Sequence, residues 1–225
     1  MNLELQGKVA LVGGASQGIG YAIARLLAAE GMCVAIAARK EAPLLAARDR
    51  IAAETGAELL AVPTDLRSSE SCSAFVAAAA AKFGRIDVLV NNDGAPPLGR
   101  LDSFDDAAWA KAIDQNLMSV VRMARATLPH MRRAGGGRIV NITVNTICPG
   151  RIRTERLDKV YGKLATDAGK DISTLYSDLG REVPLKRIGT PDEIAGFVAF
   201  LCSAYGSYMT GTTTAIDGGR RAALL

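Results

Sequence analysis

Glycines spaced for phosphate binding lie near the start of the chain. Gly14, Gly18 and Gly20 stand between the apolar run 8–13 and a segment with helical periodicity. Glycines at such a turn let backbone N–H groups approach a diphosphate, and the following helix N-terminus adds partial positive charge. Glycines also serve ordinary tight turns, but the strand–turn–helix setting favours a dinucleotide-binding turn.

Two basic residues stand at the end of the second apolar run, 33–39. A carboxylate at this place binds the ribose hydroxyls of NAD, whereas a cation accommodates the 2′-phosphate of NADP. The chain has Arg39 and Lys40 and no acid before Glu41. The guanidinium of Arg39 is a planar fork suited to phosphate. The pattern favours NADP(H), with NAD(H) as a possible second coenzyme and simple surface charge as the alternative explanation.

The elements that must position these residues alternate along the chain. Runs typical of strands buried on both faces occupy 8–13, 33–39, 58–65 and 86–92, with helical patterns between them. Thr190, Pro191 and Glu193 form a strong helix start. The order predicts an α/β fold over residues 1–225: a single-domain, doubly wound parallel sheet (Rossmann fold) with three αβα layers.

A long helix is predicted after the fourth strand. Ser103 and Asp106 resemble a capping box at its start, and the helix carries Trp109, Ile113 and Leu117. Asn116 lies near its middle.

These motifs, in this order, resemble the short-chain dehydrogenase/reductase family, of the type of bacterial 3-oxoacyl-acyl-carrier-protein reductases. The glycines follow the family spacing G-x-x-x-G-x-G, with Gly13 in place of the usual threonine. The run 91–94 resembles the family motif N-N-A-G, except that Asp93 replaces the alanine. Pro149, Gly150 and Thr154 match the family segment P-G-x-x-x-T.

The resemblance implies a coenzyme site at the carboxyl ends of the strands. Asp65 and Leu66 match the pair that contacts adenine, although Asp65 could instead cap the next helix. Residues 155–184, which are polar and weakly patterned, would form a lid over the substrate. The implied coenzyme contacts are Gly14, Ser16, Gln17, Gly18, Ile19, Gly20, Arg39, Lys40, Asp65, Leu66, Asn92, Gly94, Ile142, Pro149, Gly150, Ile152 and Thr154.

The proton-transfer residues of the family are missing. A carbonyl that accepts a hydride develops an oxyanion, which family members stabilise and protonate with Ser, Tyr and Lys, assisted by an Asn. Asn116 matches that Asn, the alternative being a structural hydrogen bond inside its helix. None of the five tyrosines has a lysine four residues later, and the gap falls between Thr143 and Val144.

At this gap the predicted strand 138–143 runs directly into the predicted strand 144–150. Parallel neighbours need a crossover of about a dozen residues or more, and family members place about forty here. Either the protein made in the cell contains a segment that the printed sequence lacks, which we favour, or the deletion is real and the sheet cannot form normally.

The sequence therefore predicts an NADP(H)-dependent short-chain oxidoreductase that interconverts a carbonyl of the 3-oxoacyl type and a secondary alcohol by hydride transfer. The alternative is a non-catalytic nucleotide-binding or regulatory protein without the Tyr–Lys pair. The resemblance implies a small-molecule or acyl-carrier-bound substrate and a homotetramer or homodimer. An acidic carrier would suit Arg122, Arg125, Arg132 and Arg133, the alternative being that these side chains are simply solvated.

Composition excludes several other classes. With 49% hydrophobic and 22% charged residues the 225-residue chain is globular, and its net charge of +4 is too scattered for a nucleic-acid surface. One histidine, His130, and four separated cysteines argue against a metal site and a Ser-His-Asp triad. No apolar run approaches ~20 residues, so we expect no membrane span or signal peptide and a cytoplasmic location.

Overall fold

The computed structural model describes residues 2–92, 103–141, 145–167, 169 and 171–220. Its main sheet has five parallel strands in the order β3-β2-β1-β4-β5, which confirms the predicted α/β class. The strands are β1 (Val9–Gly13), β2 (Cys33–Ala38), β3 (Leu59–Pro63), β4 (Val88–Asn91) and β5 (Arg138–Asn141).

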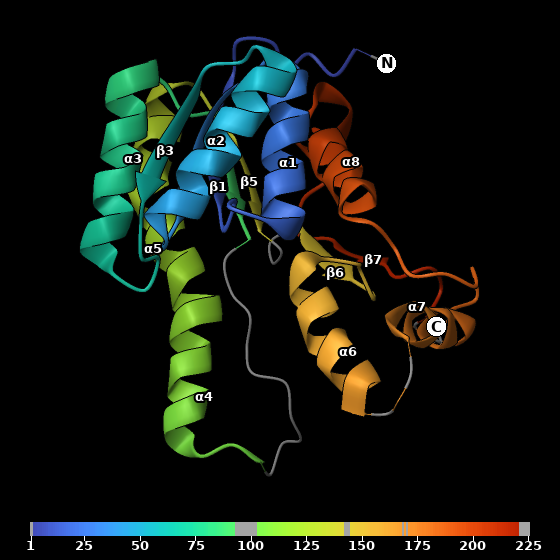
Figure 1. The fold of residues 1–225 in the computed structure, drawn as a ribbon. Coiled ribbons are helices and arrows are strands. Elements are labelled where there is room, and N and C mark those ends of the chain that lie inside the picture. The colour runs from blue at the N-terminus through green and yellow to red at the C-terminus, as the bar shows by residue number, and fades with distance from the viewer. Residues whose placement is uncertain (1, 93–102, 142–144, 168, 170, 221–225) are drawn as a thin grey trace.

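Helices cover both faces of this sheet (Figure 1). Alternate β1 residues point to two separate cores, Ala10 and Val12 to one and Val9 and Leu11 to the other. Each fully buried aliphatic side chain contributes about 1.5–3 kcal/mol, so both layers stabilise the strand that carries the glycine turn. The first core contains α1 (Gly18–Ala29), α2 (Glu41–Thr55) and α8 (Pro191–Cys202), and the second contains α3 (Ser69–Phe83) and α5 (Ser119–Arg133).

The long helix predicted after the fourth strand is present but starts differently. It comprises α4 (Asp106–Ile113), the π-helical turn η2 (Asp114–Met118) and α5. The predicted capping box at Ser103 is wrong, because Asp105 is the cap: its carboxylate accepts from the Ala108 N–H at 2.8 Å.

The apolar side chains of α4 and η2 are exposed. Trp109, Ile113 and Leu117 are 44%, 51% and 57% exposed. The reason is visible in Figure 1, where α4 projects beyond the carboxyl edge of the sheet. Within the described residues, nothing covers this apolar face enough to bury it.

The last two strands form a sheet of their own. β6 (Thr146–Pro149) pairs in parallel with β7 (Thr213–Ile216), and neither strand joins β5. Only residues 142–145 separate β5 from β6, which is too short for a parallel crossover. The expectation that these two strands cannot be ordinary sheet neighbours is thus confirmed, and the β6–β7 pair lies beyond the carboxyl edge of the main sheet (Figure 1).

The segment between β6 and α8 is helical. It contains α6 (Glu155–Asp167) and α7 (Ile172–Arg181), and the short 3-10 helix η3 (Ala204–Gly206) follows α8. Among the helices that the structure describes, none combines the length and the apolar character needed to cross a bilayer.

α8 begins where the sequence predicts and packs against α1. The Thr190 N–H donates to Glu193 Oε2 at 2.9 Å, and Arg187 holds the same carboxylate through two hydrogen bonds. The pKa of Glu193 is lowered to about 2, mainly by the hydrogen bonds from Arg187. The carboxylate therefore stays charged and capping at neutral pH.

We expect Glu193→Ala to lower the free energy of unfolding by about 1 kcal/mol at pH 7, because a helix cap is lost. The depressed pKa means that this stabilisation is complete above the ordinary glutamate pKa and fades as the pH falls toward 2. Urea unfolding of both proteins at pH 7 and pH 3 measures this, and the difference between them should shrink at pH 3. An equal difference at both values would contradict the charged cap.

Candidate functional site

The glycine-rich turn joins β1 to α1 and leaves its backbone open. Gly14 and Gly18 have φ angles of +61° and +62°, a left-handed conformation that favours glycine. No side chain caps the N-terminus of α1 at Gln17, and the first turn contains no acidic residue. The partial positive charge of this helix end is therefore available to an anion, which fits the diphosphate of a dinucleotide.

Gly20 lets this turn fold against the end of β4. A Cβ at Gly20 would lie 2.3 Å from the Gly14 carbonyl oxygen and 2.5 Å from Asn92 Nδ2. Asn92 Nδ2 itself donates to the Gly14 oxygen at 3.4 Å. The structure thus brings Asn92 to the glycine turn, as expected for residues that share one site.

The chain after β6 reaches the same turn. A Cβ at Gly18 would lie 3.6 Å from Cγ2 of Thr154, so Thr154 borders the turn. Thr154 Oγ1 also accepts from the Leu157 N–H at 3.3 Å, at the start of α6. α6 accordingly begins just below the start of α1 in Figure 1. The two motifs lie side by side although β6 has left the main sheet.

The other members of the P-G-x-x-x-T segment have structural contacts. A Cβ at Gly150 would lie 2.6 Å from Cα of Asp217, and the Gly150 N–H donates to the Ile216 oxygen at 2.9 Å. Ile152 is buried. Glycine at 150 is therefore required for the close approach of β7, and contact of Pro149, Gly150 and Ile152 with a coenzyme stays a prediction.

The ends of β2 and β3 lie next to each other. Ala38 is paired with Pro63, and the Thr64 N–H donates to the Ala38 oxygen at 2.9 Å. Arg39 and Lys40, which follow β2, are exposed. Asp65 comes just after β3, so two basic residues and one carboxylate meet at this corner.

Asp65 does not cap α3. Ser68 is the cap, and its hydroxyl accepts from the Ser71 N–H at 3.1 Å, so the capping alternative is wrong. The Asp65 carboxylate instead accepts hydrogen bonds from Nε and from the backbone N–H of Arg67, at 2.9 and 3.0 Å. Arg67 was not among the residues expected from the sequence. The available signal was the spacing Asp-x-Arg, in which an arginine can fold back onto the carboxylate.

Leu66 belongs to the core. Its side chain is buried, and a Cβ at Gly13 would lie 3.0 Å from Leu66 Cδ1. Leu66 thus packs closely against Gly13. Only the backbone of Leu66 remains for contact with adenine.

The remaining predicted contacts differ in exposure. In the turn, Gln17 is exposed and Ser16 is half-buried, whereas Ile19 packs against the first core. Gly94 and Ile142 lie outside the described residues.

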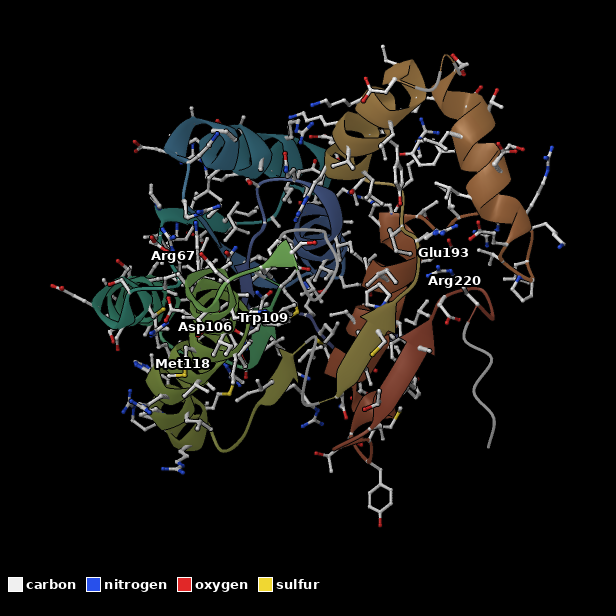
Figure 2. The ribbon with its side chains drawn as sticks, turned by 90° about the horizontal axis from the view of Figure 1, so that it is seen from below. Arg67, Asp106, Trp109, Met118, Glu193 and Arg220 are labelled. Carbon is white, nitrogen blue, oxygen red and sulfur yellow. The ribbon has the colours of Figure 1, made fainter. Side chains whose placement is uncertain are left out.

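Asn116 lies in the π-helical turn η2, near the end of α4 that adjoins the sheet. Its Nδ2 donates to the Ala112 oxygen at 2.8 Å, which is the structural hydrogen bond considered as its alternative role. Arg122 Nη2 donates to Asp114 Oδ1 at 2.6 Å across the turn, so this side chain is not free for an acidic carrier. Figure 2 shows Asp106, Trp109 and Met118 along this helix. A part in proton transfer stays a prediction for Asn116.

Tyr176 cannot replace the missing tyrosine. Its hydroxyl donates to Asp158 Oδ1 at 2.7 Å, and the Arg153 guanidinium lies 4.8 Å from its ring centroid. Burial and the hydrogen bond to Asp158 raise the pKa of Tyr176 well above its ordinary value. Proton transfer near neutral pH favours a lowered pKa, and this hydroxyl is already engaged with Asp158, so Tyr176 joins α6 to α7.

Comparison with known proteins places the chain in one family. The short chain dehydrogenase family matches residues 8–146, and the family described as Enoyl-(Acyl carrier protein) reductase matches residues 140–221. The short-chain reductase protein NovJ of Streptomyces niveus is 34% identical over 252 residues, covering 96% of this chain and 94% of that protein. The 3-oxoacyl-(acyl-carrier-protein) reductase FabG of Chlamydia muridarum is 34% identical over 247 residues, covering 97% and 99%.

A solved structure agrees with the sequence matches. L-sorbose reductase from Gluconobacter frateurii, complexed with NADPH and L-sorbose, has a TM-score of 0.95 at 30% identity, with both chains fully covered. Both sequence alignments are longer than the 225 residues of this chain, so the relatives carry residues that it lacks. The two family matches meet at residues 140–146, where the crossover is missing. The chain belongs to the short-chain dehydrogenase/reductase family.

Proposed function

We propose that the protein is an NADP(H)-dependent oxidoreductase that interconverts a carbonyl of the 3-oxoacyl type and a secondary alcohol. The observation that carries this proposal is the meeting of Asn92 and Thr154 at the turn of Gly14, Gly18 and Gly20. Three segments far apart in the sequence converge there on one uncapped helix end. Such a crevice at the carboxyl ends of parallel strands suits a dinucleotide.

Each part of the crevice has a proposed task. The backbone of residues 14–20 would hold the diphosphate, Arg39 and Lys40 the 2′-phosphate, and Asp65 the adenine. Asn92 and Thr154 would orient the nicotinamide half. When bound, the reduced nicotinamide would supply the hydride that a carbonyl accepts.

Relatives support NADP(H) and a ketone substrate. L-sorbose reductase was solved with NADPH and L-sorbose, and a polyketide ketoreductase variant with NADPH has a TM-score of 0.86 at 28% identity. The relative from Chlamydia muridarum is named as a 3-oxoacyl reductase. The exposed Arg39 and Lys40 of this chain suit the extra phosphate of NADPH.

The rest of the chain would serve the same site. We propose that residues 1–225 form one coenzyme-binding domain and that residues 155–184 are its substrate lid, joined internally by the Tyr176–Asp158 hydrogen bond. A homotetramer or homodimer and a cytoplasmic location stay predictions. Asn116 would assist a Ser-Tyr-Lys set carried by the missing segment.

The second candidate is a nucleotide-binding or regulatory protein without turnover. The missing Tyr–Lys pair favours it, because nothing in the printed sequence follows the Y-x-x-x-K pattern. Both candidates bind NADPH, so binding does not distinguish them.

Mass and turnover, measured on the protein purified from its natural source, distinguish them. We expect an intact mass above 23.6 kDa, the value for the printed chain, and oxidation of NADPH in the presence of a generic β-keto ester. A folded protein of 23.6 kDa that binds NADPH without turnover would contradict the enzyme and establish the second candidate.

A further inference from the structure

The corner at the ends of β2 and β3 brings together charges of both signs. Arg39 and Lys40 are exposed, and Asp65 lies beside them on the neighbouring strand end. Arg39 is close enough to Asp65 to contribute to the lowering of its pKa, yet it forms no ion pair within 4 Å in the described part of the chain. The guanidinium of Arg39 is therefore free to bind a ligand.

Arg67 occupies the carboxylate that could otherwise capture Arg39. Both Asp65 oxygens accept from Arg67: Nε lies at 2.9 and 3.2 Å from them, and Nη2 donates to Oδ2 at 2.5 Å. The backbone N–H is a third donor, to Oδ1. The hydrogen bonds from Arg67 are the main reason why the pKa of Asp65 falls to about 2. The carboxylate is thus ionised at any physiological pH, and its charge is balanced within its own turn.

The pair remains open to a coenzyme. The side chains of Arg67 and Asp65 are 35% and 38% exposed, and Arg67 is labelled in Figure 2, which views this edge of the sheet. A phosphate monoester carries close to two negative charges at neutral pH, and an unbalanced carboxylate beside it would repel it. Four charged side chains, three of them basic, give this corner a net positive charge.

We propose that Arg67 sets coenzyme selectivity: by holding Asp65, it keeps Arg39 available for the 2′-phosphate of NADP(H). Arg67 is a positioning residue in this scheme, because it acts through Asp65 and Arg39. The inference rests on the proposed function, in which this corner receives the adenosine end of the coenzyme. Without Arg67, Asp65 would pair with Arg39 and would repel the phosphate.

The test is a set of calorimetric titrations with NADPH and NADH. We expect Arg67→Ala to lower the ratio of NADPH affinity to NADH affinity by about tenfold. The variant lacks the positive charge of Arg67, and the guanidinium of Arg39 would pair with Asp65 and not with the 2′-phosphate. The affinity for NADH should change little. The adenine contact of Asp65 is common to both coenzymes and cancels in the ratio. The variant should fold, since an exposed ion pair contributes only ~0–1 kcal/mol.

A second variant and a matched control separate charge from structure. Asp65→Asn combined with Arg67→Ala removes the unbalanced carboxylate and should restore the wild-type ratio to within about threefold. Arg48→Ala removes one arginine from a comparable Arg–Asp pair on α2 and should leave the ratio unchanged. If Arg67 served only to stabilise the fold, the double variant would not restore the ratio of NADPH affinity to NADH affinity.

The outcomes that overturn this inference are distinct from failure of the proposed function. If the wild type prefers NADPH and Arg67→Ala keeps that preference, or loses both coenzymes equally, the inference alone is wrong. If the wild type binds neither coenzyme, the proposed function fails and the inference falls with it. A lowered ratio that the double variant does not restore also overturns the inference, because Asp65 would not be the link.

Discussion

Replacing Gly20 by alanine should weaken NADPH binding by at least about tenfold and lower the free energy of unfolding by roughly 1–3 kcal/mol. The added Cβ would lie 2.3 Å from the Gly14 oxygen and 2.5 Å from Asn92 Nδ2, closer than atoms can approach. Either the turn, which would hold the diphosphate, or Asn92, which would orient the nicotinamide half, must move. Calorimetry with NADPH and urea unfolding measure the two effects.

Gly196→Ala is the matched control for this change. Gly196 lies in the middle of α8, and an added Cβ there meets nothing within 4 Å. Alanine is the better helix former, so this variant should be more stable by about 0.5–1 kcal/mol and should bind NADPH as the wild type does. If Gly20→Ala and Gly196→Ala had the same NADPH affinity and the same free energy of unfolding, the close packing at Gly20 would not be needed for coenzyme binding or for stability.

Inserting a crossover between Thr143 and Val144 should create turnover. The insert would be the crossover with Ser, Tyr and Lys that the family resemblance implies at this place, longer than the roughly dozen residues that a parallel connection needs. General acid–base groups contribute about 10²–10⁴-fold to a rate, so oxidation of NADPH by a β-keto ester should rise from the background level. The insert should also let β6 join β5 in one sheet, which should raise the free energy of unfolding.

The control for the insertion is the same segment with its tyrosine replaced by phenylalanine. This protein should fold and bind NADPH but lose the added turnover. A folded insertion protein that binds NADPH and shows no tyrosine-dependent turnover would contradict the view that only the missing segment separates this chain from an active enzyme.

The strands and helices of the coenzyme half could be predicted because local patterns specify them. The strand residues of β1 and the central residues of β2 are buried on both faces, as their apolar runs indicate, and α3 lies between the third and fourth strands, where a helical pattern was expected. The start of α8 could also be predicted from the sequence, because Thr190, Pro191 and Glu193 act through contacts within one helical turn. Such short-range signals do not depend on the missing segment.

Features that depend on distant partners could not be predicted in the same way. The pattern of Trp109, Ile113 and Leu117 indicates an apolar face, but a pattern does not tell whether anything covers it. Likewise, Asp65 could have capped α3, and only the fold shows that Ser68 takes this role and that Arg67 binds the carboxylate.

The gap after Thr143 was visible in the sequence because chain length limits topology. Two parallel neighbours cannot be joined by residues 142–145, whatever their side chains, and β6 indeed pairs with β7 alone. The sequence did not show that Thr154 would still reach Gly18. β6 pairs with β7 and α8 packs against α1, and both of these partners are encoded far downstream.

Calorimetric titration of NADPH into the folded 225-residue chain tests the central claim most directly. The account predicts saturable binding at one site per chain, since the glycine turn, Asn92 and Thr154 are already assembled without the crossover. A flat titration on protein that unfolds cooperatively in urea would contradict it.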